Sequence, residues 1–156
     1  MSSNSQRSFK VYKIDNGTVI DHINSSMALK IIDILEIKKD GIVSIGMNFD
    51  SAVTGKKDII KIENVHLDKK HTDMIAIFSP QATINIIKDS EVVEKRQVEV
   101  PKVINKVLRC PNPTCVTNKY HDCDSKFIVE HYDENQTYGR CYYCERETLI
   151  TPDLVK

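Results

Sequence analysis

Residues 110–115 read Cys-Pro-Asn-Pro-Thr-Cys, and residues 141–144 read Cys-Tyr-Tyr-Cys. Two thiolates separated by two to four residues can both point into one tetrahedron, and a second such pair completes a shell of four sulfur ligands. A closed shell leaves no position for water and is typical of structural sites. The spacing therefore predicts one structural Zn²⁺ per chain, bound by Cys110, Cys115, Cys141 and Cys144.

Other roles for these cysteines stay open at this point. Two disulfides would suit a secreted domain, but residues 1–7 lack the apolar segment of a signal peptide, so we expect reduced thiols and a cytoplasmic protein. A redox-active pair would normally open a helix, whereas the residues after the second pair favour a turn entering a strand. Counting also leaves a different quartet open, for example with Cys123 in place of Cys144, or with His121 or His131.

Charge is balanced along the whole chain. The 156 residues contain 22 lysines and arginines and 22 aspartates and glutamates, with 14 of each sign in residues 1–100 and 8 afterwards. A nucleic-acid-binding zinc ribbon needs a basic face, so local neutrality favours a protein surface as the partner of the zinc module. The alternative is a nucleic-acid-binding zinc-ribbon protein, in which Tyr142 and Tyr143 would stack on bases. No apolar run approaches the roughly 20 residues of a membrane span.

The residues before the cysteines carry the pattern of an α+β domain. The order is strand, helix, strand, strand, helix, strand, with one added strand, which is the ferredoxin-like split βαβ pattern. It predicts an antiparallel sheet with both helices on one face. The expected strands are 9–22 with an interruption at 15–17, 42–49, 57–65, 83–87 and 91–98, and the expected helices are 27–37, capped by Ser25 or Ser26, and 69–78, capped by Asp68.

Composition divides the chain into four parts. Residues 1–8 are expected to be a disordered arm, 9–98 one domain, 99–103 a linker, and 104–156 a small all-β domain resembling a zinc ribbon. The last part is too short to bury a large core, so a metal is physically sensible there. Its expected strand pieces are the short apolar segments 107–108, 127–129, 142–143 and 149–150.

No catalytic constellation is recognisable in the sequence: it lacks a phosphate-binding glycine loop, a nucleophile elbow and a zinc-protease motif. Two polar segments do suggest binding. Asp21 and His22 end the first strand region, and Lys57 and Lys61 lie on the strand expected beside it. A carboxylate near lysines could hold the sugar hydroxyls and phosphates of a nucleotide. The alternative is a solvated charged rim.

Five segments resemble one known family. Gly-Thr-Val-Ile-Asp-His-Ile at 17–23, Gly-Lys-Lys-Asp-Ile-Ile-Lys-Ile-Glu-Asn at 55–64 and Pro-Gln-Ala-Thr-Ile-Asn at 80–85 resemble signature stretches of the regulatory chain of aspartate carbamoyltransferase. Cys-Pro-Asn at 110–112 and Cys-Tyr-Tyr-Cys-Glu at 141–145 match its zinc domain. The resemblance covers the chain from about residue 9 to 155.

The resemblance implies a non-catalytic allosteric subunit that controls pyrimidine biosynthesis by feedback. Its first domain would bind CTP, ATP and, as a further candidate, UTP, with Mg²⁺ as a candidate companion, and would pair with a second regulatory chain. Its zinc domain would dock on the catalytic chains that join carbamoyl phosphate to aspartate. The implied assembly is a dodecamer of six catalytic and six regulatory chains, without nucleic acid or membrane.

The resemblance also assigns roles to residues of the first domain. Backbone groups of Val11, Tyr12 and Ile14 would contact the base, Asp21 the ribose, Lys61 the base and sugar, and Lys95 the phosphates. The remaining site residues would be His22, Lys57, Asn85, Ile87 and Val92. Ser90 stands where the family often has an aromatic residue, and Tyr12 and Lys13 also depart from it, so these positions bear on base selectivity.

Overall fold

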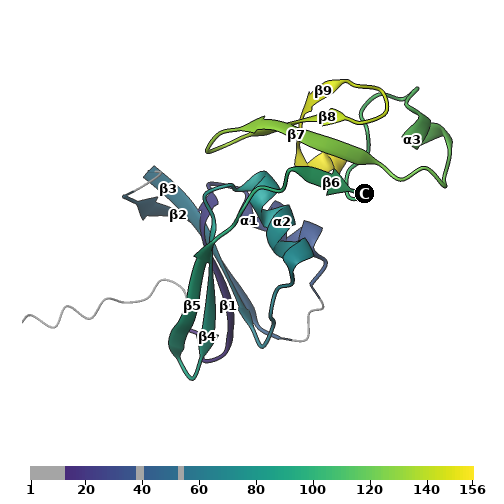
Figure 1. The fold of residues 1–156 in the computed structure, drawn as a ribbon. Coiled ribbons are helices and arrows are strands. Elements are labelled where there is room, and N and C mark those ends of the chain that lie inside the picture. Colours follow the sequence, from purple (N-terminus) through teal and green to yellow (C-terminus); the bar gives the residue numbers. More distant parts are fainter. Residues whose placement is uncertain (1–12, 38–40, 53–54) are drawn as a thin grey trace, which may run out of the picture.

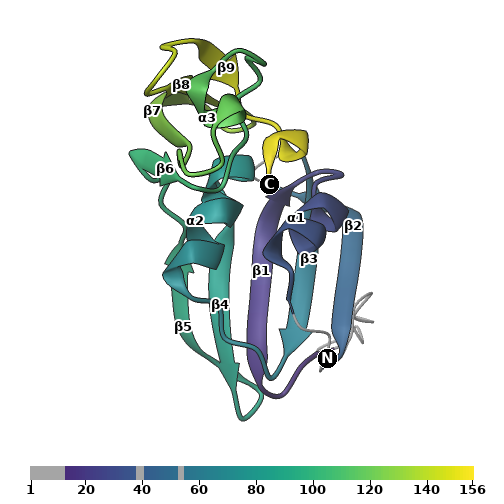
Figure 2. The ribbon, with the colours of Figure 1, turned by 90° about the vertical axis from the view of Figure 1, so that its right-hand side faces the viewer.

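The computed structural model describes residues 13–37, 41–52 and 55–156 and contains two antiparallel sheets. The first sheet contains β1 (Gly17–Asn24), β2 (Val43–Ser51), β3 (Gly55–Glu63), β4 (Thr83–Lys88) and β5 (Glu91–Gln97). Helices α1 (Ala28–Leu35) and α2 (Lys69–Phe78) cover one face of it (Figures 1 and 2). The expected arm at 1–8, Val11 and Tyr12 lie outside the described residues.

The strand order of this sheet is β2-β3-β1-β4-β5. The connection through α1 passes over β3, and the connection through α2 passes over β1. Without β5 this is the split βαβ arrangement, so the ferredoxin-like α+β prediction is confirmed. The other face of the sheet carries neither helix (Figure 2).

The core lies between the sheet and the two helices. Ile60, Ile20 and Ile84 are directly paired across β3, β1 and β4, and all three are fully buried. They pack with Ile31 of α1 and Ile75 of α2 in one hydrophobic cluster. Successive side chains of a strand point to opposite faces of the sheet. The residues directly before and after each isoleucine on its own strand therefore point to the uncovered face.

Asp68 caps α2 as predicted, but a serine does not cap α1. The Asp68 carboxylate accepts a hydrogen bond from the backbone N–H of His71 at 2.9 Å. At α1 the N-cap residue is Met27, and no side chain in the N-cap position bonds to the helix. Instead the Ala28 N–H donates to Asp58, 30 residues away on β3. The sequence prediction was wrong because the acceptor comes from tertiary structure.

The second sheet has the order β6-β7-β8-β9, and the cysteine pairs lie in turns beside it, with Cys141 at the end of β8. Its strands are β6 (Val103–Asn105), β7 (Lys126–Tyr132), β8 (Thr137–Cys141) and β9 (Glu147–Leu149), with the short helices α3 (Val116–Lys119) and η1 (Pro152–Leu154). Two expected strand pieces are not strands. Leu108 forms only an isolated bridge to Val155, and residues 142–143 lie in the turn after β8 because that turn must bring two cysteines together.

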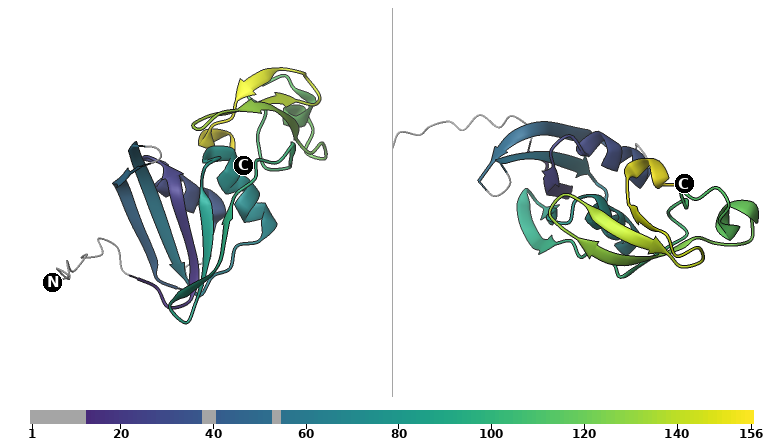
Figure 3. Two further views of the ribbon diagram at one scale, coloured as in Figure 1. Left: turned by 60° about the vertical axis from the view of Figure 1, so that its left-hand side comes forward. Right: turned by 90° about the horizontal axis from the view of Figure 1, so that it is seen from above.

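The second sheet stands at one end of the first, beside the helices (Figure 3). Residues from both sheets belong to one continuous hydrophobic cluster, which includes Ile75 of α2, Phe127 of β7 and Ile150 after β9. The Thr137 hydroxyl of β8 also donates to the Ile77 carbonyl of α2 at 2.8 Å. The second sheet is therefore packed against α2 of the first domain rather than only joined to it by residues 98–102.

In the three ranges that the structure describes, no helix is both long and apolar enough to cross a membrane.

Asp58 provides a stability test of the first domain. Its carboxylate is fully buried and accepts from Ala28 N–H at 3.1 Å and from Asn48 N–H at 2.9 Å, at a bulge in β2. We expect Asp58→Ala to lower the free energy of unfolding by about 2–4 kcal/mol, because the buried Ala28 N–H and the part-buried Asn48 N–H both lose their acceptor. Urea denaturation measures this change.

Asp50→Ala is the matched control. Asp50 forms an exposed ion pair with Lys56, and its loss should cost about 0–1 kcal/mol. Equal effects of the two variants would show that the buried carboxylate does not organise this part of the fold.

Candidate functional site

Four thiols form a compact cluster beside the second sheet. The sulfur atoms of Cys110, Cys115, Cys141 and Cys144 all lie within 4.8 Å of one another. Cys110 Sγ is 3.6 Å from Cys144 Sγ, and Cys115 Sγ is 3.7 Å from Cys141 Sγ. A disulfide would need about 2.05 Å. Four Zn–S bonds of about 2.3 Å in a tetrahedron place sulfurs about 3.8 Å apart, so the cluster fits a tetrahedral metal ion such as zinc.

Two tight turns present these thiols. In the first, Cys115 N–H donates to the Asn112 carbonyl at 3.0 Å, and the Asn118 amide donates to the carbonyls of Cys110 and Asn112 at 2.8 and 2.7 Å. In the second, Glu145, with a left-handed φ of 60°, donates its N–H to the Cys141 carbonyl at 2.9 Å. Backbone and amide bonds thus fix both turns with the thiols pointing at one another.

Electrostatics of the cluster favour a bound cation. Burial raises the pKa of the Cys110 thiol and of the Cys141 thiol. Burial also opposes ionisation of Cys144, but hydrogen bonds from the Arg146 N–H and from Asn112 outweigh it and lower the pKa to about 7. Metal binding must therefore displace protons from buried thiols, and the positive ion offsets the charge that results.

The other candidate ligands lie outside the cluster. Among the described residues, the group with metal-ligand geometry contains neither Cys123 nor a histidine. Cys123 lies beside Tyr143, where its negative charge would raise the pKa of the tyrosine hydroxyl. His131 contacts the Tyr138 ring, with 4.5 Å between ring centroids, and Glu147. The sulfur positions thus favour Cys110, Cys115, Cys141 and Cys144 as the ligands over a quartet that includes Cys123 or a histidine.

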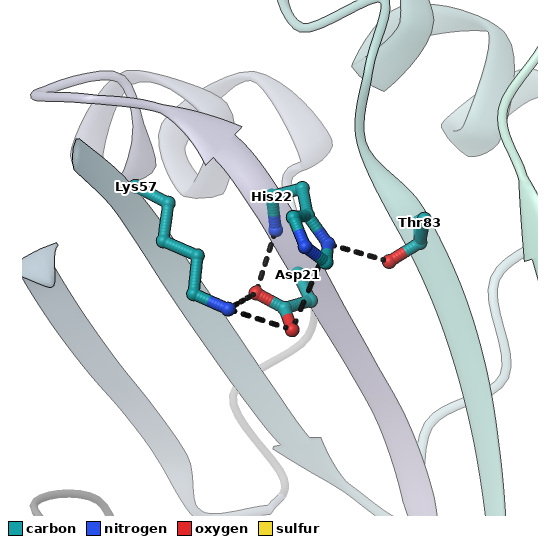
Figure 4. A network of polar contacts seen from close by, with 4 residues as sticks. All are labelled: Asp21, His22, Lys57 and Thr83. Atoms are coloured by element: carbon teal, nitrogen blue, oxygen red, sulfur yellow. Dashed lines mark hydrogen bonds and ion pairs between the residues drawn. The ribbon is translucent and has the colours of Figure 1, made fainter. Parts of the chain in front are cut away.

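A second polar cluster lies on the face of the first sheet opposite the helices (Figure 4). The Lys57 ammonium is 2.9 and 3.2 Å from the two Asp21 carboxylate oxygens. The backbone N–H of His22 donates to the same carboxylate at 2.6 Å, and Nδ1 of the His22 ring lies 3.3 Å from the Thr83 hydroxyl. All four residues are half-buried. These contacts hold the Asp21 carboxylate in place, and the surface above it remains open.

A bulge in β1 creates this arrangement. The register shifts between Ile20 and Ile23, both fully buried, and His22 has a left-handed φ of 56°. The extra residue lets Asp21 and His22 lie together between two core isoleucines. The local geometry of a bulge therefore positions the carboxylate and the imidazole.

Strand register aligns the remaining polar candidates across the same face. Lys61 is opposite Val19, Val19 is opposite Asn85, and Asn85 is opposite Lys95. Directly opposite residues in an antiparallel sheet share a face, so this row crosses four strands. Burial lowers the pKa of Lys61, and the Asp21 carboxylate opposes that shift. A lysine partly removed from water on an open face gains from a bound anion.

Apolar candidates lie to one side of this row, toward the turn between β4 and β5. Ile14 and Ile87 are buried, and Val92 is exposed on β5 opposite Ile87. The turn between β4 and β5 is fixed by Ser90, whose hydroxyl bonds to the Asp15 carboxylate and whose N–H donates to the Asp15 carbonyl at 2.8 Å. The serine thus joins this turn to the chain before β1.

Sequence reasoning did not identify Thr83 as part of the site. Its hydroxyl is the partner of the His22 ring, and its backbone lies opposite Asp21 in the register of β1 and β4. The only available signal was its position as the first residue of the expected strand 83–87. Pairing that strand with the first one would have been needed to find the contact.

Two family models match this chain, one over the part with the first sheet and one over the part with the second sheet. Residues 9–99 match the family model for the allosteric domain of the aspartate carbamoyltransferase regulatory chain, and residues 102–150 match the model for its metal binding domain. Aspartate carbamoyltransferase regulatory chains of Methanococcus aeolicus and Pyrococcus horikoshii are each 46% identical to this chain. These matches cover 90% and 88% of this chain, and 89% and 90% of the relatives.

The thiol cluster generates a prediction on metal content. We expect purified chain to contain about one zinc per chain and Cys141→Ser to lose most of it, because three sulfurs cannot close the shell. Residues 104–156 of that variant should lose their ordered structure, since the metal replaces part of a small core. Elemental analysis and circular dichroism measure the two effects.

Cys123→Ser is the matched control, because that thiol lies outside the cluster. It should keep zinc and fold. Loss of zinc in Cys123→Ser, or retention of stoichiometric zinc in Cys141→Ser, would show that the quartet is assigned incorrectly.

Proposed function

This chain belongs to the family of aspartate carbamoyltransferase regulatory chains, and on that premise we propose that it senses nucleoside triphosphates and controls catalytic chains of the same enzyme. It is a regulatory chain and not the catalytic subunit. Its metal binding domain carries the four-thiol cluster. We propose CTP and ATP as the effectors and zinc as the metal. We also propose that effector binding controls pyrimidine synthesis through the catalytic chains.

The observation that carries the effector proposal is the open face of the first sheet. The Asp21 carboxylate is fixed by Lys57 and by the His22 N–H, and it retains lone pairs that can accept from ribose hydroxyls. Such preorganised carboxylates bind hydroxyl groups without paying to reorient. We assign Asp21 to the ribose.

The row of residues from Lys61 to Lys95 supplies the positive charge. Neighbouring strands are about 4.8 Å apart, so three spacings separate the backbones of the two lysines by about 14 Å across the sheet. A triphosphate nucleotide lying across the strands can meet Lys61 near its sugar and Lys95 at its phosphates. Asn85 lies between them and offers an amide that can bind base, sugar or phosphate.

The end of the open face next to the turn between β4 and β5 suits a base. Ile14, Ile87 and Val92 provide apolar surface next to backbone groups of the segment before β1. Together with Val11 and Tyr12, which lie outside the described residues, these backbone groups would read the base edge. Ser90 and Asp15 close this end through their hydrogen bonds, so they bear directly on which base is accepted.

We assign the zinc module, residues 104–156, to docking on the catalytic chains. Its surface exposes four apolar or aromatic side chains around the metal cluster: Val116, Tyr120, Tyr142 and Tyr143. The two adjacent tyrosine rings meet edge to face, 5.3 Å between centroids, and Lys126 lies over the Tyr142 ring. Tyrosine-rich patches are characteristic of protein interfaces. Zinc, bound by the four cysteines, would supply only structural cross-linking there.

We place a second regulatory chain on the first domain, in an assembly of six catalytic and six regulatory chains. Near the edge strand β2, the side chains of Leu29 and Ile42 are exposed. Exposed apolar residues beside an edge strand fit an interface with another copy. The zinc modules then remain accessible to catalytic chains.

Lys95→Ala tests the effector site. We expect it to weaken CTP and ATP binding at least about tenfold, since a charge-assisted contact to phosphate is lost, while assembly with catalytic chains is kept. Isothermal titration calorimetry of the assembled enzyme measures binding, and aspartate saturation curves measure the response.

Arg96→Ala is the matched control. Arg96 follows Lys95 directly but is opposite the buried Ile84, and it lies with residues of α2 on the helix side of the sheet. Its loss should leave nucleotide titration unchanged. Identical titration curves for Lys95→Ala and the parent chain would overturn the phosphate assignment.

A further inference from the structure

The carboxyl end of α2 receives hydrogen bonds from both halves of the molecule. The Asn24 side-chain amide, at the end of β1, donates to the Phe78 carbonyl at 3.3 Å. The Thr137 hydroxyl, at the start of β8, donates to the Ile77 carbonyl at 2.8 Å. The last carbonyl groups of a helix have no partner within it, so donors from elsewhere decide how that end is held. Here one donor comes from each sheet.

Ser79, directly after α2, connects the same point to the first sheet. It is fully buried, and its hydroxyl accepts from the Asn24 N–H at 3.2 Å. Its carbonyl accepts from the Ala82 N–H at 3.0 Å, and its own N–H donates to Ile75 at 2.7 Å. The end of β1 and the approach to β4 are thus both fixed to the last turn of α2.

These two strand ends also carry the polar cluster of the open face. Asn24 is directly opposite Lys57, which is paired with Asp21. Ala82 precedes Thr83, which contacts the His22 ring (Figure 4). A ligand that shifts Asp21, His22 or Lys57 therefore acts on the same strand ends that hold the end of α2.

On the other side, Thr137 is connected to the metal cluster. It is the first residue of β8, and Cys141 is the last. Its carbonyl accepts from the Ile150 N–H at 2.9 Å, which ties it to the segment after β9. Thr137 is buried in the contact between the two sheets. A displacement of α2 along this bond moves a strand that carries a metal ligand.

We propose that Asn24, Ser79 and Thr137 form the coupling element of this chain, through which nucleotide binding on the open face changes the position of the zinc module. This inference rests on the proposed nucleotide-sensing function and adds the residues that carry the signal. The bond from Thr137 to Ile77 is the contact whose strength differs between the two global states. Allosteric coupling requires such a differential contact.

The apolar packing around this bond cannot replace it. The hydrophobic cluster that spans the two sheets stabilises their association, but hydrophobic contacts have no preferred direction. A hydrogen bond to a specific carbonyl depends steeply on distance and angle. Removing one hydroxyl should therefore separate coupling from assembly.

The test uses the complete enzyme, with catalytic chains and zinc. Thr137→Val keeps the shape of the side chain and removes the donor, while Thr137→Ser keeps a hydroxyl. Thr148→Val is the matched control, because the Thr148 hydroxyl bonds to the neighbouring Leu149 carbonyl within the second sheet and not to α2. For each variant, zinc content and complex size are measured first, then the CTP dissociation constant and the half-saturating aspartate concentration with and without CTP or ATP.

We expect a parental change in half-saturating aspartate within the usual range of about 5–150-fold for allosteric coupling. In Thr137→Val this ratio should fall towards one, with kcat, assembly and the CTP dissociation constant of the enzyme without aspartate essentially unchanged. Thr137→Ser should retain most of the ratio, and Thr148→Val all of it. A merely structural role of Thr137 would instead lower assembly or kcat.

Asn24→Ala is an independent test of the coupling element, since it removes the other side-chain donor to the end of α2. It should also reduce the ratio, and the double variant Asn24→Ala/Thr137→Val should lose no more than the larger single effect, because one route cannot be broken twice. Full nucleotide response in Thr137→Val, or additive losses in the double variant, would overturn the coupling element. If the parent enzyme bound no nucleotide, the proposed function itself would be wrong.

Discussion

A helix that ends in the interior of a protein must find partners for its last carbonyl groups, and the fold of this chain depends on how α2 meets that requirement. Phe78 and Ile77 obtain donors from Asn24 of β1 and Thr137 of β8. One helix end therefore fixes the end of β1, the central strand of the first sheet, together with the position of the second sheet. The positions of the open face, of the metal cluster and of the contact between the two domains all depend on how this helix end is held.

The metal cluster answers a different constraint. The second sheet is small, and its buried side chains include the thiols of Cys110, Cys115 and Cys141 alongside Phe127 and Ile104. Buried thiols with raised pKa values form no cross-link until a cation replaces their protons. Metal binding thus completes the core that the first sheet and α2 pack against.

Sequence patterns predicted the features that depend on short separations. The helical period and the Asp68 cap located α2, alternation located β3 and β4, and cysteine spacing identified the quartet of thiols. Features that join distant segments were not visible. Asp58 caps α1 from 30 residues away, and the bulge at His22 follows from packing of the isoleucines on either side. Thr137 carries no sequence signal, because its partner is a backbone carbonyl 60 residues earlier.

In the coupling that we propose, nucleotide binding on the first sheet changes the position of the zinc module across the end of α2. Amide hydrogen exchange of the assembled enzyme, with and without saturating CTP, measures this most directly. Coupling across α2 predicts slower exchange in residues 17–24 and 57–61 together with a change in β8, residues 137–141. A change confined to the first sheet would contradict the coupling, and no change in either sheet would contradict nucleotide sensing.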